Sequence, residues 1–293
     1  MLTMKKDCPR VAAIQMVSTR SYDKNWAITR ELTECAREQG ADIVIWPENF
    51  LAYGETRNFS LQRQRDTLDA ISSLSKSLEL WIVAGTLPLQ IDLREEVSNE
   101  RYAERPKATT VVYDVNGSAH VEYSKIHLFD AKIGSDRGIY RESDDYLHGN
   151  RPVIFESPWG RVGLAICYDL RFSELFLDLV NMGAKMIFVP YAFTKTTGRN
   201  HWELLVRTRA VETQCYVVAA NQGGWHSKKL CTWGETMIVD PWGKVLNKVV
   251  KGKGIAIADL DISYVDRVRA NIPMKEHREA AKKRAVKMTQ TDE

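Results

Sequence analysis

Short apolar runs alternate with amphipathic segments in the first third of the chain, and this order constrains the fold more than any other feature. The runs 11–16, 43–46 and 81–84 have the length and composition of buried strands. The segments between them carry apolar side chains at helical spacing, first Ile28, Leu32, Cys35 and Ala36, then Leu68, Ile71, Leu74 and Leu78. A strand–helix–strand–helix–strand order predicts an α/β fold whose mainly parallel sheet is covered by helices.

The middle of the chain reads as a hairpin followed by an irregular stretch. Apolar runs at 111–115 and 119–123 flank Asn116-Gly117, which predicts a type I′ turn. Residues 125–152 are rich in polar side chains and glycine, so no regular element is expected there.

The second half returns to strands and helices. The run 162–166 leads into Cys167, and the run 186–189 is expected to stop at Pro190. Asn200, with Glu203 three residues on, predicts a helix start. Late strands are expected at 216–220, 236–240, 244–249 and 255–260. No internal repeat or linker divides the chain, so we expect one domain over 1–275 and a basic, solvated tail over 276–293.

Charge and composition exclude several classes of function. The 293 residues include 41 basic and 38 acidic side chains, a net charge of +3 that gives no field for nucleic acid. No apolar run approaches the roughly 20 residues of a membrane span, and residues 1–10 have no signal-peptide core. The five scattered cysteines suit free thiols in a reducing compartment. We therefore expect a cytoplasmic protein with neither membrane nor nucleic-acid partners.

Three reactive side chains follow predicted strands. Glu48 comes directly after one buried run, Lys125 follows a hairpin strand, and Cys167 follows another buried run. The carboxyl ends of strands in an α/β sheet are where ligands bind. A thiol, a carboxylate and an ammonium meeting there could transfer an acyl group. A helix starting after Cys167 would donate backbone N–H groups to the oxyanion and lower the thiol pKa.

Each of these residues alone is more often structural: a strand-end cysteine is usually an inert core thiol, and a lone Glu or Lys a solvated loop residue. Their joint pattern resembles the nitrilase superfamily of carbon–nitrogen hydrolases. The matching pieces, in that family's order and spacing, are Trp46-Pro47-Glu48, Tyr123-Ser124-Lys125-Ile126-His127-Leu128-Phe129 and the stretch 163–175.

The resemblance extends from about residue 11 to 273 and carries expectations. It implies an α-β-β-α sandwich that commonly doubles in a homodimer to an eight-layer arrangement. It also implies a Glu48–Lys125–Cys167 triad, with Glu142 as a second glutamate that orients Lys125. No cofactor or metal is expected, because the six histidines lack metal-ligand spacing.

The later half, from His201 to Gly243, is similar to the branch that contains deaminated-glutathione amidase and omega-amidase, and more similar to the former. We therefore expect hydrolysis of a small carboxylate-bearing amide through a cysteine acyl-thioester. Omega-amidase action on 2-oxoglutaramate, N-carbamoyl hydrolysis and nitrile hydrolysis stay open, as do a catalytically silent binding protein and a redox-sensing role for Cys167. The candidate substrate-binding residues are Arg171, Tyr168, Phe193 and Thr194. Arg171 could bind a substrate carboxylate or instead pair with Glu174.

Overall fold

The computed structural model describes residues 8–51, 53, 59–90, 105–133 and 139–290, with backbone only for 285–290. Its first sheet has seven strands, in the order β15-β1-β2-β3-β5-β4, with β6 paired to β5. The parallel strands β1, β2 and β3 form its centre, as the opening pattern predicts. The strands are β1 (Arg10–Gln15), β2 (Ile43–Ile45), β3 (Trp81–Val83), β4 (Leu87–Leu89), β5 (Lys107–Tyr113), β6 (Ala119–Ser124) and β15 (Gly254–Asp259).

The second sheet has six strands, in the order β14-β13-β12-β11-β10-β9. Its central strands β10, β11 and β12 are also parallel to one another. Their carboxyl ends therefore lie at one edge of this sheet. The strands are β9 (Val153–Ser157), β10 (Gly160–Leu164), β11 (Met186–Tyr191), β12 (Tyr216–Asn221), β13 (Met237–Val239) and β14 (Val245–Lys248).

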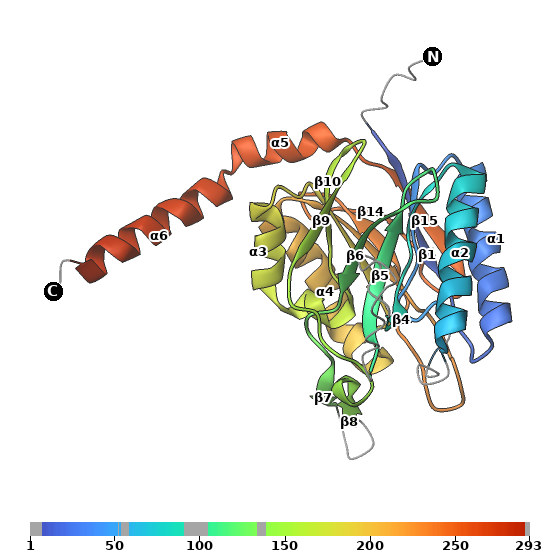
Figure 1. The fold of residues 1–293 in the computed structure, drawn as a ribbon. Coiled ribbons are helices and arrows are strands. Elements are labelled where there is room, and N and C mark those ends of the chain that lie inside the picture. The colour runs from blue at the N-terminus through green and yellow to red at the C-terminus, as the bar shows by residue number, and fades with distance from the viewer. Residues whose placement is uncertain (1–7, 52, 54–58, 91–104, 134–138, 291–293) are drawn as a thin grey trace, which may run out of the picture.

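Helices cover the outer face of each sheet, which gives four layers (Figure 1). On the first sheet, α1 (Tyr22–Glu38) and α2 (Leu61–Leu78) bury a core that includes Leu32 and Ile71. On the second, α3 (Ser173–Asn181) and α4 (Lys195–Thr213) bury another that includes Phe176 and Trp202. A third core fills the space between the sheets. The predicted α-β-β-α sandwich is confirmed.

Smaller elements complete the structure. The two-stranded sheet of β7 (Asp130–Lys132) and β8 (Ile139–Arg141) lies within the stretch expected to be irregular, so that expectation was wrong there. Two 3₁₀ turns follow, η2 (Glu142–Asp144) and η3 (Cys167–Arg171). The chain ends in α5 (Ile262–Asn271) and α6 (Met274–Gln290), and α6 points away from the sandwich (Figure 1). The boundary at 275 stays a prediction. None of the helices in the described part of the chain is long and apolar enough to cross a membrane.

The hairpin between β5 and β6 has a different turn from the predicted one. Gly117 is left-handed, with φ of +80°, but Asn116 is absent from the residues with positive φ that a type I′ turn requires. Asp114 accepts backbone hydrogen bonds from Asn116 and Ser118 through its side chain, and the strand register shifts beside Tyr113. The side chain of Asp114 therefore favours a longer turn with a left-handed glycine and a bulge.

Two predicted boundaries near the site were also wrong. Strand β11 continues through Pro190, because its pairing with β10 ends at Phe188 and only β12 lies alongside further on. Helix α4 begins at Lys195, with Thr194 and not Asn200 as its N-cap: the Thr194 hydroxyl accepts from the Thr197 N–H at 3.3 Å. Both shifts bring residues 192–197 to the carboxyl end of β11.

Candidate active site

Glu48 lies just past β2, and its backbone is fixed on both sides. Its carbonyl oxygen accepts a hydrogen bond from Gln222 Nε2 at 3.0 Å, and the next N–H, of Asn49, donates to Thr86 Oγ1 at 2.9 Å. Gly85 has φ of +38°, and a Cβ there would lie 2.2 Å from the carbonyl oxygen of Pro47. Only glycine allows this close approach, so the chain on which Glu48 stands is held rigidly.

Lys125 follows β6, and its side chain is 1% exposed. Its Nζ donates to Glu48 Oε1 at 3.0 Å and to Glu142 Oε1 and Oε2 at 2.9 and 2.8 Å. Glu142, at the start of η2, also accepts from the Phe129 N–H at 2.6 Å. Two carboxylates therefore fix the position of one buried ammonium group.

Cys167 adopts a left-handed backbone conformation, with φ of +44°, at the start of η3. Non-glycine residues rarely occupy this region, and active sites are where such conformations are often found. The sulfur lies close to Glu48, whose carboxylate charge acts on the thiol, and close to the backbone of Ala192. The three side chains of the predicted triad thus meet at one place, with Glu48 bonded to Lys125 and adjacent to Cys167.

The turn that carries Cys167 is held by a buried carboxylate, Asp169, which is 0% exposed. Its Oδ2 accepts from the Ile166 N–H at 2.9 Å and from the Tyr123 hydroxyl at 2.7 Å. Its Oδ1 accepts from the His127 N–H at 2.9 Å and lies 2.7 Å from His127 Nδ1. Asp169 therefore ties the turn to the segment that carries Lys125.

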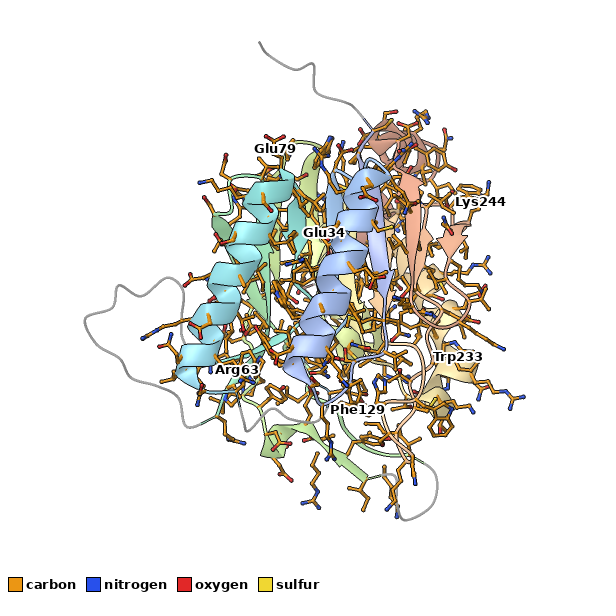
Figure 2. All side chains as sticks on the ribbon, turned by 90° about the vertical axis from the view of Figure 1, so that its right-hand side faces the viewer. Glu34, Arg63, Glu79, Phe129, Trp233 and Lys244 are labelled. Atoms are coloured by element: carbon orange, nitrogen blue, oxygen red, sulfur yellow. The ribbon has the colours of Figure 1, made fainter. Side chains whose placement is uncertain are left out.

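A pocket of about 400 Å³ opens onto this group. All eight residues singled out from the sequence line it, namely Glu48, Lys125, Glu142, Cys167, Tyr168, Arg171, Phe193 and Thr194. The pocket lies where β2, β10 and β11 end, so its placement follows the rule for strand carboxyl ends. Figure 2 shows the lining residue Phe129 toward the end of the molecule that also holds Arg63 at the start of α2, away from Glu79 at the other end of that helix.

Burial and neighbouring charges set the protonation of the three groups. Burial raises the pKa of Glu48, an effect that Lys125 opposes and Glu142 reinforces. Burial alone would lower the pKa of Lys125, but the carboxylates of Glu142 and Glu48 raise it well above its usual value. Lys125 is therefore a permanent cation, and Glu48 is a base that takes up a proton more readily than a solvated glutamate does.

The expected lowering of the thiol pKa was wrong. Burial, followed by the charge of Glu48, raises the pKa of Cys167 well above its usual value of 9.0. The element after Cys167 is a short 3₁₀ turn and α3 begins only at Ser173, so no long helix dipole points at the sulfur. The resting thiol is accordingly neutral, so an attack by its sulfur would require a base to take the proton.

Arg171 lies at the wall of the pocket and not against Glu174. Its Nη2 is 3.2 Å from His201 Nδ1, and its guanidinium stacks over the rings of Tyr168 and Phe193 at 5.9 and 5.3 Å. Among the described residues no ion pair joins Arg171 to Glu174, whose Oε2 accepts instead from Ser173 Oγ at 3.3 Å. This geometry leaves the guanidinium edge available to the pocket.

Several pocket residues were missed from the sequence, including Tyr53, Tyr140, Arg141 and Tyr146. Tyr53 stacks on His226 with ring centroids 4.0 Å apart, so His226 supports the pocket wall. In the sequence, the only sign that Tyr53 belongs to the site is that it follows Glu48 by five residues. The others belong to the stretch read as irregular, where no periodicity gave a signal.

Comparisons with known proteins identify the family of the chain. Residues 10–270 match the carbon–nitrogen hydrolase family. The chain is 36% identical to the deaminated glutathione amidase of Bos taurus, over 93% of this chain and 82% of that protein. It is also 36% identical to the deaminated glutathione amidase of Dictyostelium discoideum, over 92% and 93%.

Solved structures show the same fold. The C. elegans NitFhit protein superposes with a TM-score of 0.84 at 33% identity, covering 92% of this chain and 65% of that longer one. Saccharomyces cerevisiae Nit3, a member of branch 10 of the nitrilase superfamily, gives a TM-score of 0.78 at 25% identity, covering 91% and 95%. With its matched fold and sequence, the chain belongs to the carbon–nitrogen hydrolase family and is an amidase of the nitrilase superfamily.

Proposed function

We propose that the enzyme cleaves its amide through an acyl-thioester on Cys167, with Glu48 as proton shuttle and Lys125 as the oxyanion donor. The observation that carries this proposal is the connected group of thiol, carboxylate and ammonium at the floor of one pocket. Glu142 holds Lys125 in place and is a positioning residue.

The proposed steps balance with these groups alone. Glu48 takes the proton of the Cys167 thiol as the sulfur attacks the amide carbon, and Lys125 stabilises the negative charge on the oxygen. Glu48 then gives the proton to the leaving nitrogen, the carbon–nitrogen bond breaks, and a thioester remains. Glu48 next removes a proton from water, which attacks the thioester carbon. The proton returns to sulfur, and a carboxylic acid leaves.

The proposed substrate is deaminated glutathione, cleaved to 2-oxoglutarate and cysteinylglycine. Two relatives at 36% identity carry the name deaminated glutathione amidase. The pocket of about 400 Å³ has a volume typical of small-molecule sites. In this proposal Arg171 receives the carboxylate of the 2-oxo-acid part, since a guanidinium can donate two parallel hydrogen bonds to a carboxylate. Tyr168, Phe193 and Thr194 shape the wall around it.

The test is a side-by-side kinetic comparison of deaminated glutathione, 2-oxoglutaramate and the ester that neutralises the 2-oxo-acid carboxylate. We expect the highest kcat/KM for deaminated glutathione and little turnover of the ester. Preference for 2-oxoglutaramate would move the assignment to omega-amidase. Equal turnover of the ester would remove the proposed role of Arg171.

A homodimer in the cytoplasm is the proposed working form. All five cysteines are free in the structure, and a nucleophilic thiol among them suits a reducing compartment. The dimer is supported by exposed apolar side chains on the outer face of α4 and beside it, Leu204, Val211 and Trp242.

A further inference from the structure

Two arginines line the pocket, and they come from different parts of the fold. Arg171 belongs to η3, four residues after the nucleophile, and Arg141 is the last residue of β8, exposed at the rim. Among the described residues, the Arg141 side chain forms no hydrogen bond or ion pair, and the Arg171 side chain hydrogen-bonds only His201. The pocket therefore has two guanidinium groups that no carboxylate in the described part of the chain holds in an ion pair.

The acidic residues nearby are already engaged. Glu48 and Glu142 both bind Lys125. Asp130 faces Arg141 across the β7–β8 pair, and hydrogen bonds from Ser143, with a smaller contribution from the Arg141 charge, lower its pKa. Its Oδ1 accepts from the Ser143 N–H at 3.0 Å, and it forms no ion pair with Arg141. Asp145, the remaining acidic lining residue, also has an interaction of its own. Because arginine forks match carboxylates bidentately, two such groups in one pocket fit a ligand with two separated carboxylates.

We propose that Arg141 forms a second carboxylate subsite, which binds the free carboxylate of the leaving group. This inference rests on the proposed function, and it deepens it: the substrate class becomes an amide with one carboxylate on the acyl part and another on the departing amine. A single carboxylate on the acyl part would need only Arg171.

The positions of the two arginines in the pocket indicate which end of the substrate each one binds. The acyl group stays bonded to Cys167 through both half-reactions, so Arg171, on the same short turn, suits the acyl carboxylate. The amine must leave toward solvent, and Arg141 stands exposed at the rim. A dipeptide amine extends at most about 3.5 Å per residue, so its carboxylate lies roughly 7 Å from the scissile nitrogen. That reach carries the carboxylate away from the nucleophile and toward the rim.

The test compares wild type, Arg141→Ala and Arg141→Lys on three amides. These are deaminated glutathione, its analogue with the glycine carboxylate converted to a primary amide, and 2-oxoglutaramate, which releases only ammonia. Arg30→Ala is the matched control, since it also removes one positive charge. Arg30 belongs to α1, which covers the outer face of the seven-stranded sheet. Arg141 is exposed, so its replacement should leave the melting temperature unchanged.

For Arg141→Ala we expect kcat/KM for deaminated glutathione to fall at least about tenfold, through KM, which is the scale of one lost charge-assisted hydrogen bond. The two amides without the second carboxylate should change less than about twofold, and Arg141→Lys should recover part of the loss. An equal fall on all three amides, or no fall on deaminated glutathione, would overturn the subsite alone. If wild type hydrolysed none of the three, the proposed substrate class and the subsite would both be wrong.

Discussion

At the residue scale, the site depends on one buried ammonium group held between two carboxylates. Lys125 Nζ lies 2.8–3.0 Å from three oxygens of Glu48 and Glu142, so hydrogen bonds from two sides fix its position. An oxyanion donor works only when it points at the place where charge develops. Placement of the charge, as well as its presence, should therefore matter.

Lys125→Arg tests that requirement, because it keeps the charge and changes the shape of the donor. We expect kcat to fall at least on the order of a hundredfold, the scale of losing one oxyanion donor, while KM changes little. Glu142→Gln weakens the hydrogen bonds to the ammonium group but leaves the lysine present, so kcat should fall less than in Lys125→Arg. Steady-state kinetics of the two variants gives the comparison, and a nearly wild-type Lys125→Arg enzyme would contradict the proposed role.

The acid limb of the pH profile tests the raised pKa of Glu48. In the proposed mechanism the free enzyme needs Glu48 ionised to accept the thiol proton, and ionised Glu48 becomes more abundant as pH rises. A raised pKa moves this requirement to higher pH, so kcat/KM should fall as pH drops through a midpoint above 4.5, the usual value for glutamate. Lys125 stays charged throughout this range. A midpoint at or below 4.5 in stopped-time assays of folded enzyme would argue against Glu48 as the base.

The sequence was sufficient to name the residues proposed to react but not those that hold them. Glu48, Lys125 and Cys167 each end a recognisable apolar run, and a short motif surrounds each one. Asp169 was inside one of these motifs, yet its role depends on contacts with Tyr123 and His127 more than 40 residues away. Such long-range partners leave no periodic signal in one sequence.

At the element scale, the turn carrying Cys167 depends on Asp169. This buried carboxylate accepts from two backbone N–H groups and from the Tyr123 hydroxyl. Each donor left buried and unpaired costs about 1–3 kcal/mol. Asp169→Ala should therefore lower the free energy of unfolding by at least about 3 kcal/mol.

Asp169→Asn keeps the shape of the side chain but replaces one acceptor oxygen with an NH₂ group, which cannot accept a hydrogen bond from the neighbouring donors. We expect this variant to remain folded, to lose a smaller part of its stability, and to fall at least about tenfold in kcat, since Cys167 and Lys125 are no longer tied together. Urea unfolding followed by kinetics gives both values. Asp178→Asn on the exposed face of α3 is the control and should change neither. Full activity in Asp169→Asn would show that the turn needs no such tie.

Element types were easier to predict than element ends. Strands of the two sheets followed from apolar runs, because burial on both faces requires such runs. The extension of β11 through Pro190 could not be predicted, since it depends on where the neighbouring β10 stops pairing. The cap at Thr194 was also missed, because the first turn of α4 packs against Trp233, which is distant in sequence: a Cβ on Gly198 would lie 2.3 Å from the Cβ of Trp233.

At the scale of the whole molecule, the outer face of α4 is the surface on which two copies could meet. Leu204 is 65% exposed and Val211 47% exposed on this helix. Trp242, 59% exposed, belongs to the turn after β13, which is held to α4 by the bond from Arg207 Nε to the Gly243 carbonyl at 2.8 Å. Pairing through this face would place helix against helix and give the eight-layer arrangement.

Light scattering after size exclusion tests this pairing. We expect a mass of about twice 33.5 kDa for wild type and a shift toward the monomer for Leu204→Glu combined with Val211→Glu. Val250→Glu, at another exposed apolar residue, should leave the mass unchanged. A monomeric wild type, or a double variant that keeps the larger mass, would contradict a dimer through α4.

The central claim is that Cys167 carries the acyl group, and trapping that group tests it most directly. Wild-type enzyme mixed with deaminated glutathione, quenched in acid and digested, should carry the acyl mass on the peptide that contains Cys167 and on no other cysteine peptide. Cys167→Ala should fold normally, form no adduct and lose turnover. An adduct on Cys8, Cys35, Cys215 or Cys231, or substantial turnover by folded Cys167→Ala, would contradict the account.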